Sequence, residues 1–392
     1  MLLAQNTTFI IGPIAKLLGI IINVIYEGLT YIGIENVALS IILFTVFVQV
    51  LMIPLKYKSQ KFTRLTAMIQ PEIAAIRKKY EGKRDQQTMS LMQQETNEVY
   101  RKYGASPTGG CLPMLVQMPI LFALYAVIRN VPSYVQGIRG VYEQVAPFVS
   151  SEAGVKTLHG IKEVAGVNLQ AGNTESVIDW LYNFNIADWQ VLVKNVAEVP
   201  QAIVDKIVNI SRVFGDVLVS DTPWSLIKAN GYIHWIWILP ILVYVTQMLA
   251  MKTAQAKNQM DGPGMNQMKM MNRIMPIMSV VFSIALPVGL GIYWITNSVL
   301  MTIQQIFMNR HIDKIGIENI IEKNVKKNES KHERAKEKKG VDSGTVKRAA
   351  ALNTKSIKEN GSTGTPETEQ VPAAGTDSIG AIARLTDKYK NE

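Results

Sequence analysis

Residues 41–55 read IILFTVFVQVLMIPL, an apolar run that is interrupted near its middle by one glutamine, Gln49. A helix needs about 20 predominantly apolar residues to cross a bilayer. Comparable runs occur at 111–128 and 232–251, and a longer one extends from 274 to 308. Of all residues 48% are hydrophobic and only 18% are charged, whereas about a quarter of a soluble protein is charged. The sequence therefore predicts an all-α, polytopic membrane protein.

The run from 274 to 308 is too long for a single crossing. Pro287, Gly289 and Gly291 lie inside it, and these residue types suit a tight turn between two antiparallel helices. If the run is divided there, it supplies two spans. The number of predicted membrane-spanning helices is then five.

Residues 9–26 form a further apolar segment, for which two interpretations compete. The segment is long enough for a sixth span, but Lys16 interrupts it and Pro13 lies nearby. A helix that lies in the plane of the membrane interface accommodates a charged residue more readily. We therefore expect an interfacial amphipathic helix rather than a span.

Basic residues are distributed unevenly between the segments that join the predicted spans. Segment 56–107 holds 11 basic and five acidic residues, whereas segment 131–230 holds seven basic and ten acidic residues. Lysine and arginine near span ends favour the cytoplasmic side. We therefore expect 56–107 and the C-terminal tail to be cytoplasmic and 131–230 to be extracytoplasmic. Five spans then place the N-terminus outside and the C-terminus inside.

These expectations define a layout for the whole chain. It consists of an interfacial helix in 1–35, spans at 36–55, 108–130, 231–252, 271–287 and 288–309, a cytoplasmic helical hairpin at 56–107, an extracytoplasmic loop insertion at 131–230, a cytoplasmic loop at 253–270, and a basic, largely disordered cytoplasmic tail at 310–392. Within the loop insertion, Trp180 and Trp189 fit two interpretations, either as interfacial anchors or as part of a small core.

Segment 56–107 has the pattern of a helical hairpin. Apolar residues recur at three- and four-residue spacing from Phe62 to Tyr80, and a second apolar stripe runs from Met89 to Tyr103. The basic residues would face outward, either as a solvated surface or as a contact for the ribosome or for lipid headgroups. The candidates for that contact are Arg77, Lys78, Lys79, Lys83 and Arg84.

Two motifs within the predicted spans combine apolar, proline and polar residues. Residues 109–125 read GGCLPMLVQMPILFALY, and residues 287–310 read PVGLGIYWITNSVLMTIQQIFMNR. Both motifs, in this order, resemble the YidC family of membrane protein insertases. The resemblance covers roughly 9–130 and 231–312 of the sequence.

The resemblance implies a five-span bundle with a polar groove in the inner leaflet, open to the cytosol and to lipid. The family carries an arginine there, five residues before the proline that ends the first span. That proline is Pro54 here, so the matching position is Gln49. We interpret Gln49 as a groove residue that keeps the slot polar without a fixed charge; the alternative is a glutamine that only bridges two helices. The candidate groove residues are Thr45, Gln49, Gln117, Gln247, Tyr293, Trp294 and Asn297.

The resemblance also implies a function, which is insertion of newly made proteins into the bacterial plasma membrane. The expected partners are nascent membrane proteins and the ribosome, with membrane lipids and the general secretion channel as further candidates. Cys111 is the only cysteine and the four histidines are scattered, so we expect no metal site. GASPTGG at 104–110 lacks the Lys-Ser/Thr of a phosphate-binding loop, and the spans hold no Ser/His/Asp order or paired carboxylates, so we expect no enzyme activity, cofactor or nucleotide hydrolysis. The alternative functions are a small-solute transporter or channel and a membrane tether for ribosomes.

Overall fold

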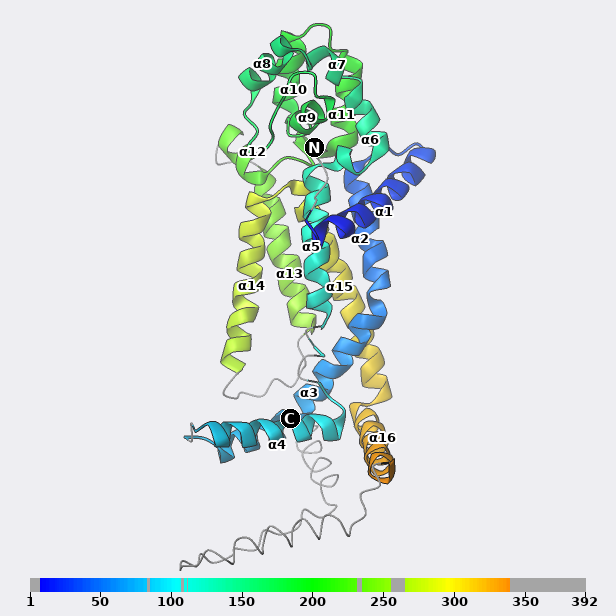
Figure 1. Cartoon of the computed structure of the whole chain (residues 1–392), viewed down its shortest axis with the longest axis vertical. Helices are drawn as coiled ribbons and strands as arrows, with labels where there is room; N and C mark the ends of the chain where they lie inside the picture. The colour runs from blue at the N-terminus through cyan, green and yellow to red at the C-terminus, as the bar shows by residue number, and fades with distance from the viewer. Residues whose placement is uncertain are drawn as a thin grey trace, which may run out of the picture. The chain divides into compact units, whose positions relative to one another are not determined.

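The computed structural model describes residues 8–82, 85–106, 109–110, 112–230, 235–254 and 265–338 (Figure 1). The chain divides into two units, residues 1–330 and 331–392. The fold presented below is that of the first unit. Among its described residues the only strands are β1 (Arg212–Phe214) and β2 (Val217–Leu218), which form one short antiparallel ladder. The prediction of an all-α polytopic membrane protein is confirmed.

The first helix, α1 (Ile11–Tyr31), is long and apolar enough to cross a membrane. Ala15, Leu18 and Ile22 are buried on one face, which packs against α2 and α5, whereas Leu17 and Ile20 are exposed on the other. The expected position of this helix in the membrane interface stays a prediction, because a one-sided apolar face suits both a peripheral span and an interfacial helix.

Helix α2 (Val37–Leu51) begins at Asn36, whose side chain accepts a hydrogen bond of 2.9 Å from the Leu39 amide. Such a cap satisfies one of the amides that a helix start leaves unpaired. Helix α3 (Ile53–Lys79) follows after Met52 at an angle of 56°. Pro54 lies in the first turn of α3, where a missing amide hydrogen matters little. The bend therefore falls where the sequence places the end of a span.

Within the described residues, two further segments meet the length and composition of a span. They are α5 (Leu112–Arg129) and Trp235–Ala254, which comprises η2 (Trp235–Trp237) and α13 (Ile238–Ala254). The bent pair α2–α3 counts as one more if it crosses as a unit. In α14 (Met265–Ala285) the apolar part is the shorter stretch Ile274–Ala285, and α15 (Val288–Ile315) follows it. The count of five spans and their boundaries stay predictions.

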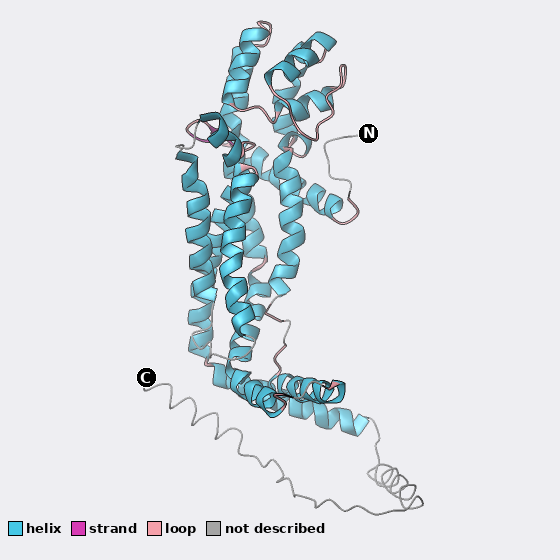
Figure 2. Ribbon diagram, turned by 90° about the vertical axis from the view of Figure 1, so that its left-hand side faces the viewer, coloured by secondary structure: helices cyan, strands magenta, loops and turns pink. Residues whose placement is uncertain are grey.

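Helices α2, α5, α13, α14 and α15 run side by side (Figures 1 and 2). Helix α15 packs against α13 and α2, and α14 packs mainly against α13. The turn between α14 and α15 comprises only residues 286 and 287, so Gly289 and Gly291 lie inside α15 and not in the turn as we expected. A Cβ atom on Gly289 would come within 2.6 Å of Val219, and one on Gly291 within 2.7 Å of Leu239. These glycines therefore serve close packing between elements.

The predicted helical hairpin consists of α3 and α4 (Gln86–Tyr103). Leu65, Ile69 and Ile73 of α3 are buried, as are Val99 and Tyr103 of α4, and the two helices pack together. These residues belong to the two apolar stripes that the sequence pattern indicates. The tip residues Lys83 and Arg84 lie outside the described residues.

The first part of the predicted tail, which is the part that the structure describes, is helical. Helix α15 continues to Ile315, Gly316 adopts a positive φ of 77°, and α16 extends over Ile317–Lys338. The side-chain amides of Asn324 and Asn328 donate hydrogen bonds to the backbone carbonyls of Tyr103 and Arg101. Those carbonyls lie at the end of α4, where a helix leaves acceptors unpaired. Residues 339–392 lie outside the described part, and the expectation of a largely disordered tail stays a prediction.

The 131–230 region folds into short helices, and its buried apolar residues form one continuous core with those of α1, α2, α5 and α15. Its elements are η1 (Val131–Ser133), α6 (Gln136–Glu143), α7 (Ala146–Val149), α8 (Glu152–Ile161), α9 (Thr174–Leu181), α10 (Ile186–Asn195), α11 (Gln201–Ser211), β1, β2 and α12 (Pro223–Asn230). Trp180 and Trp189 are each 1% exposed, which places both in the core and excludes the interpretation as interfacial anchors.

Backbone hydrogen bonds fasten the 131–230 region to the first turn of α15. The Val288 amide donates to the Asp221 carbonyl at 2.7 Å, and the Gly289 amide donates to the Val219 carbonyl at 3.0 Å. The first amides of a helix have no partner within the helix, so these carbonyls cap α15.

Candidate functional site

The most polar part of the helix bundle lies where α2, α3 and α15 meet. Gln49 is 1% exposed, and its side-chain amide donates a hydrogen bond to Asn297 Oδ1 of α15. Its oxygen, Oε1, accepts a hydrogen bond from Lys56 Nζ of α3. Lys56 Nζ also donates to Gln304 Oε1 at 3.1 Å, and Gln304 Nε2 donates to the backbone carbonyl of Gln49 at 3.0 Å. These four residues, Gln49, Lys56, Asn297 and Gln304, form a closed network that we call the polar cluster.

The bend between α2 and α3 explains the position of the polar cluster. The last carbonyls of a helix have no partner within it, and Gln49 is in the last turn of α2. The side-chain amide of Gln304 satisfies this carbonyl from the neighbouring helix. Because α3 turns away at Met52, Lys56 at the start of α3 can reach back to the Gln49 side chain.

The interpretation of Gln49 as a groove residue stays a prediction, and the structure adds one charged neighbour that the sequence pattern did not indicate. The Lys56 ammonium group hydrogen-bonds directly to the Gln49 side chain, so the polar cluster contains a positive charge supplied by a neighbouring helix. Within the part of the chain that the structure describes, Lys56 forms no ion pair. Its two side-chain partners are neutral amide oxygens.

Thr45, Gln117 and Tyr293 lie near the polar cluster on the same side of α15. Thr45 is buried one turn before Gln49, and its hydroxyl donates to the Ile41 carbonyl of its own helix at 2.6 Å. The Gln117 side-chain amide donates to the hydroxyl group of Tyr293, and this bond joins α5 to α15. Tyr293 and Asn297 are four residues apart on α15 and so share one face of the helix.

Trp294 and Gln247 do not join the polar cluster. Trp294 lies on another face of α15, and Gln247 of α13 contacts that same face. Trp294 stacks on Phe282 of α14 with ring centroids 6.4 Å apart. Gln247 of α13 accepts a hydrogen bond of 2.9 Å from the Ser298 hydroxyl. The structure therefore divides the seven predicted groove residues between two sides of α15.

A row of polar contacts that was not predicted continues from the polar cluster along α3 and α15. Gln60 Nε2 donates to Asn309 Oδ1 at 2.9 Å, and Arg64 forms an ion pair with Asp313 at 3.3 Å. Together with Lys56 and Gln304, these pairs form the polar seam. The signal was present in the sequence, because Lys56, Gln60 and Arg64 recur every four residues and so share one helix face.

The basic residues predicted to contact the ribosome or lipid lie at the end of α3 as far as they are described. Arg77 and Lys78 are exposed, and Lys79 forms an ion pair of 2.7 Å with Glu95 of α4. Hydrogen bonding to Glu95 raises the pKa of Lys79. Exposed ion pairs of this kind contribute little stability. Contact of these residues with the ribosome or lipid stays a prediction.

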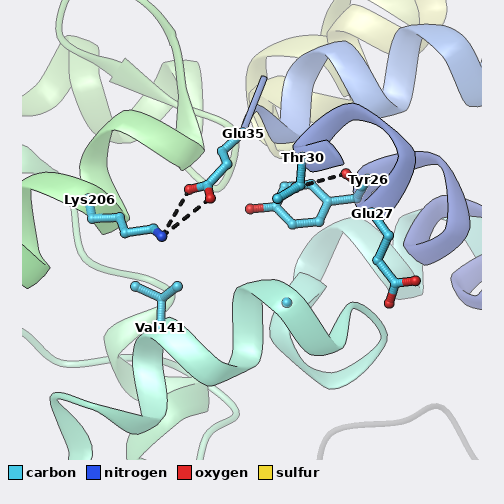
Figure 3. Close-up of a pocket in the computed structure, with 7 residues that line it drawn as sticks. Tyr26, Glu27, Thr30, Glu35, Val141 and Lys206 are labelled. Carbon is cyan, nitrogen blue, oxygen red and sulfur yellow. Dashed lines mark hydrogen bonds and ion pairs between the residues drawn. The ribbon is translucent and has the colours of Figure 1, made fainter. Parts of the chain in front are cut away.

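A cavity of about 160 Å³ lies between α1, α6 and α11, apart from all the predicted groove residues (Figure 3). The Glu35 carboxylate and the Lys206 ammonium group form an ion pair of 3.1 Å at one side of it. The Thr30 hydroxyl donates to the Tyr26 carbonyl at 3.0 Å at the other. Among the described residues no group of three or more His, Cys, Asp or Glu side chains is arranged to hold a metal ion.

An all-α chain with several apolar helices long enough to cross a bilayer, joined by buried polar side chains, defines a multi-pass membrane protein. Residues 29–315 match the family described as 60Kd inner membrane protein. This match covers most of the sequence, and the chain belongs to this family. The resemblance to the YidC family that the two motifs indicated is confirmed.

Several curated proteins are similar to the chain over most of its length. The membrane protein insertase YidC of Oceanobacillus iheyensis is 27% identical over 310 residues, which are 78% of this chain and 83% of the relative. The membrane protein insertase MisCA of Bacillus subtilis is 26% identical over 270 residues, 69% of each protein. ALBINO3-like protein 1 of Arabidopsis thaliana chloroplasts is 25% identical over 311 residues, 79% of this chain but 50% of the relative. The chain thus spans about half the length of the chloroplast relatives that it matches.

Proposed function

We propose that this protein is a membrane protein insertase of the bacterial plasma membrane. It guides hydrophobic segments of newly made proteins, with their short polar flanks, into the bilayer without nucleotide hydrolysis. Membership of the family and the names of the two bacterial relatives support this proposal. The observation that carries it is the polar cluster, in which the Gln49 side chain is buried inside a predominantly apolar helix.

The physical basis of the proposal is a barrier that the polar cluster lowers. Each methylene group of a client that enters lipid gains about 0.8 kcal/mol, so the apolar segment drives its own insertion. The polar flank opposes insertion, because an unpaired polar group in hydrocarbon costs several kcal/mol. A groove lined by the polar cluster would offer hydrogen bonds part of the way across.

The remaining parts of the proposal concern orientation and partners. The excess of basic residues in 56–107 supports a cytoplasmic hairpin, an outer N-terminus and a cytoplasmic C-terminus. Nascent membrane proteins are the clients in this proposal. The exposed basic residues Arg77 and Lys78 support contact with the ribosome or with anionic lipids. The general secretion channel is a further candidate partner.

The proposal is tested with the purified full chain in liposomes and a small single-span client. Replacement of Gln49 by alanine removes the central amide of the polar cluster, so we expect insertion to fall several-fold. Gln49→Asn keeps a shorter side-chain amide at this position, with both a donor and an acceptor, and should lose less insertion than Gln49→Ala. Thr246→Ala is the matched control, because the Thr246 hydroxyl bonds only to carbonyls of its own helix.

Two outcomes would contradict the proposal. Insertion no greater than into empty liposomes would favour a transporter or a ribosome tether. Equal insertion by the natural protein and by Gln49→Ala would show that Gln49 only joins helices and has no role in insertion.

A further inference from the structure

The β1–β2 hairpin and helix α12 lie where the helices of the bundle meet the 131–230 region. The side-chain amide of Asn36, the residue before α2, donates a hydrogen bond of 3.0 Å to the Arg212 carbonyl of β1. The ring centroids of Phe214 in β1 and Trp235 lie 4.3 Å apart. Trp235 begins the candidate span Trp235–Ala254, and α12 packs against η2 and α14. Both elements therefore lie at the level where these helices leave the bilayer.

Aromatic and basic side chains are exposed together at this level. Three large aromatic side chains are exposed, those of Phe214, Trp224 and Trp235. Arg212 is exposed two residues before Phe214, and Lys228 is exposed one turn after Trp224, with its Nζ atom 5.2 Å from the centroid of the Trp224 ring. Within the described residues neither basic side chain forms an ion pair. We call these five residues the interfacial surface.

A bilayer is the partner that fits the interfacial surface. Clusters of exposed apolar side chains are unfavourable in water and mark contacts with proteins or membranes. Tryptophan rings favour the boundary between headgroups and acyl chains, and lysine and arginine are attracted to anionic headgroups. Lipid is favoured over a protein partner because the surface continues into α13, where Ile238, Ile241 and Val245 are exposed along the candidate span.

We propose that the interfacial surface seats the 131–230 region on the bilayer. Phe214 and Trp224 enter the boundary between headgroups and acyl chains, and Arg212 and Lys228 donate hydrogen bonds to lipid phosphate groups. The role of interfacial anchor, which burial excludes for Trp180, thus falls to side chains of β1 and α12. The inference goes beyond the proposed insertase function and does not depend on it, because it requires only that the chain spans a membrane.

The test places one nitroxide spin label at a time on the purified full chain in liposomes. Cys111 is the only cysteine, so it is first replaced by serine, and the labelling site is then introduced as Phe214→Cys, Trp224→Cys or Phe148→Cys. Phe148 is the matched control, because it is an exposed phenylalanine of α7, which lies at the end of the 131–230 region that is remote from the bundle (Figure 1).

The measured quantity is the ratio of label collisions with oxygen, which concentrates in the bilayer, to collisions with a water-soluble nickel chelate. This ratio should be several-fold higher at positions 214 and 224 than at position 148. The proposal requires the increase at both positions, because β1 and α12 are separate elements and a local disturbance of one does not reproduce the result at the other. A ratio at either position equal to that at position 148 would overturn it.

The contact with lipid phosphate has its own measurement. In liposomes that contain anionic phospholipid, the double variant Arg212→Glu with Lys228→Glu should lower the ratio at position 224 several-fold, because the new carboxylates are repelled by phosphate. Lys156→Glu, at an exposed lysine of α8, is the matched control and should leave the ratio unchanged. An unchanged ratio in the double variant would overturn the role of the two basic side chains.

A second copy of the chain is the competing occupant of the interfacial surface. It would shield the labels at positions 214 and 224 from oxygen and nickel alike, and it would broaden their spectra through coupling between the labels of two copies. Shielded and broadened labels would therefore overturn the lipid contact, whereas a high ratio without broadening is the result that we expect.

Discussion

The centre of the 131–230 region and the interface of α2, α3 and α15 differ in the side chains that they enclose. The centre of the 131–230 region holds Trp180, Trp189 and their aromatic neighbours, and Trp189 lies 5.5 Å from Phe184 between ring centroids. The interface of α2, α3 and α15 holds the buried Gln49 and the half-buried Asn297 and Lys56. Burial of apolar area drives folding in water, but helices in lipid gain nothing from it and associate through packing and hydrogen bonds. Polar side chains between the helices of the bundle therefore contribute to helix association through their hydrogen bonds.

The largest effect is expected in the core of the 131–230 region. Trp180→Ala should destabilise this region by about 3–5 kcal/mol, because the cavity cannot refill. Trp224→Ala removes a tryptophan that is 48% exposed and should change stability by less than about 0.5 kcal/mol. Denaturant unfolding of the full chain in detergent, followed by limited proteolysis of the region, measures both. Similar losses for both variants would show that Trp180 is not a core residue.

A pH effect is expected from Asp221, which accepts a hydrogen bond of 2.8 Å from the Leu218 amide in the same region. Burial raises the pKa of Asp221 to about 7, with the Leu218 amide acting in the opposite sense. The folded state then holds a proton that the unfolded state releases near pH 4, so stability falls as pH rises from about 4 to 7.

Asp221→Asn keeps an oxygen acceptor for the Leu218 amide and removes the charge. Since one pKa unit corresponds to about 1.4 kcal/mol, the variant should be more stable than the natural protein by up to a few kcal/mol at pH 8 and by little at pH 4. Unfolding curves at both pH values measure this difference. Asp205→Asn, at an exposed carboxylate of α11, is the control. A gain that is the same at both pH values would rule out this role of burial.

An intermediate effect is expected where the two regions meet at Gly289. A methyl group there would approach Val219 and also Ile128, at 3.0 Å, so Gly289→Ala should destabilise the protein by about 1–3 kcal/mol. Gly140→Ala is the control, because nothing lies within 4 Å of the added atom. In that helix, α6, alanine should stabilise by about 0.5–1 kcal/mol. Thermal unfolding in detergent compares the two, and equal shifts would contradict the close approach of α15.

The smallest effect on stability is expected within the polar cluster. Asn297→Ala removes one hydrogen bond between helices, and such bonds contribute about 0.6 kcal/mol on average in membrane proteins. Insertion should nevertheless fall several-fold, because Gln49 loses the partner that orients it. Parallel measurements of unfolding and of client insertion separate the two consequences. A loss of stability as large as that of Trp180→Ala would contradict the comparison between the regions.

Local patterns predicted much of the fold. The spacing from Phe62 to Tyr80 predicted α3 and its partner helix, because one apolar stripe needs another to cover it. Features that depend on distant segments were missed. Helix α16 hydrogen-bonds to the end of α4, and Gly289 packs closely against Val219. Both contacts join segments that are distant in the sequence, so a local pattern does not indicate them.

The candidate site was predicted only in part, because its motif residues are visible in the sequence and its contacts between distant helices are not. Gln49 and Asn297 were identified as candidates through the family motifs, and the structure brings them together. Lys56 was assigned to the hairpin, because a single-helix view of the sequence cannot show that a bend returns its side chain to α2. Trp294 and Gln247 were grouped with the others, although Trp294 stacks on Phe282 of α14 and Gln247 of α13 bonds to Ser298 of α15.

The central claim is that the polar cluster serves insertion and not stability. The double variant Gln49→Leu with Asn297→Leu tests it most directly, because it replaces two paired amides by apolar groups of similar size and leaves Lys56 its second acceptor, Gln304. Loss of both partners together is close to neutral for stability, whereas loss of one leaves the other unpaired. We predict that the variant unfolds within about 1 kcal/mol of the natural protein but inserts clients into liposomes at least about tenfold more slowly. Natural rates of insertion by a stably folded double variant would contradict the claim.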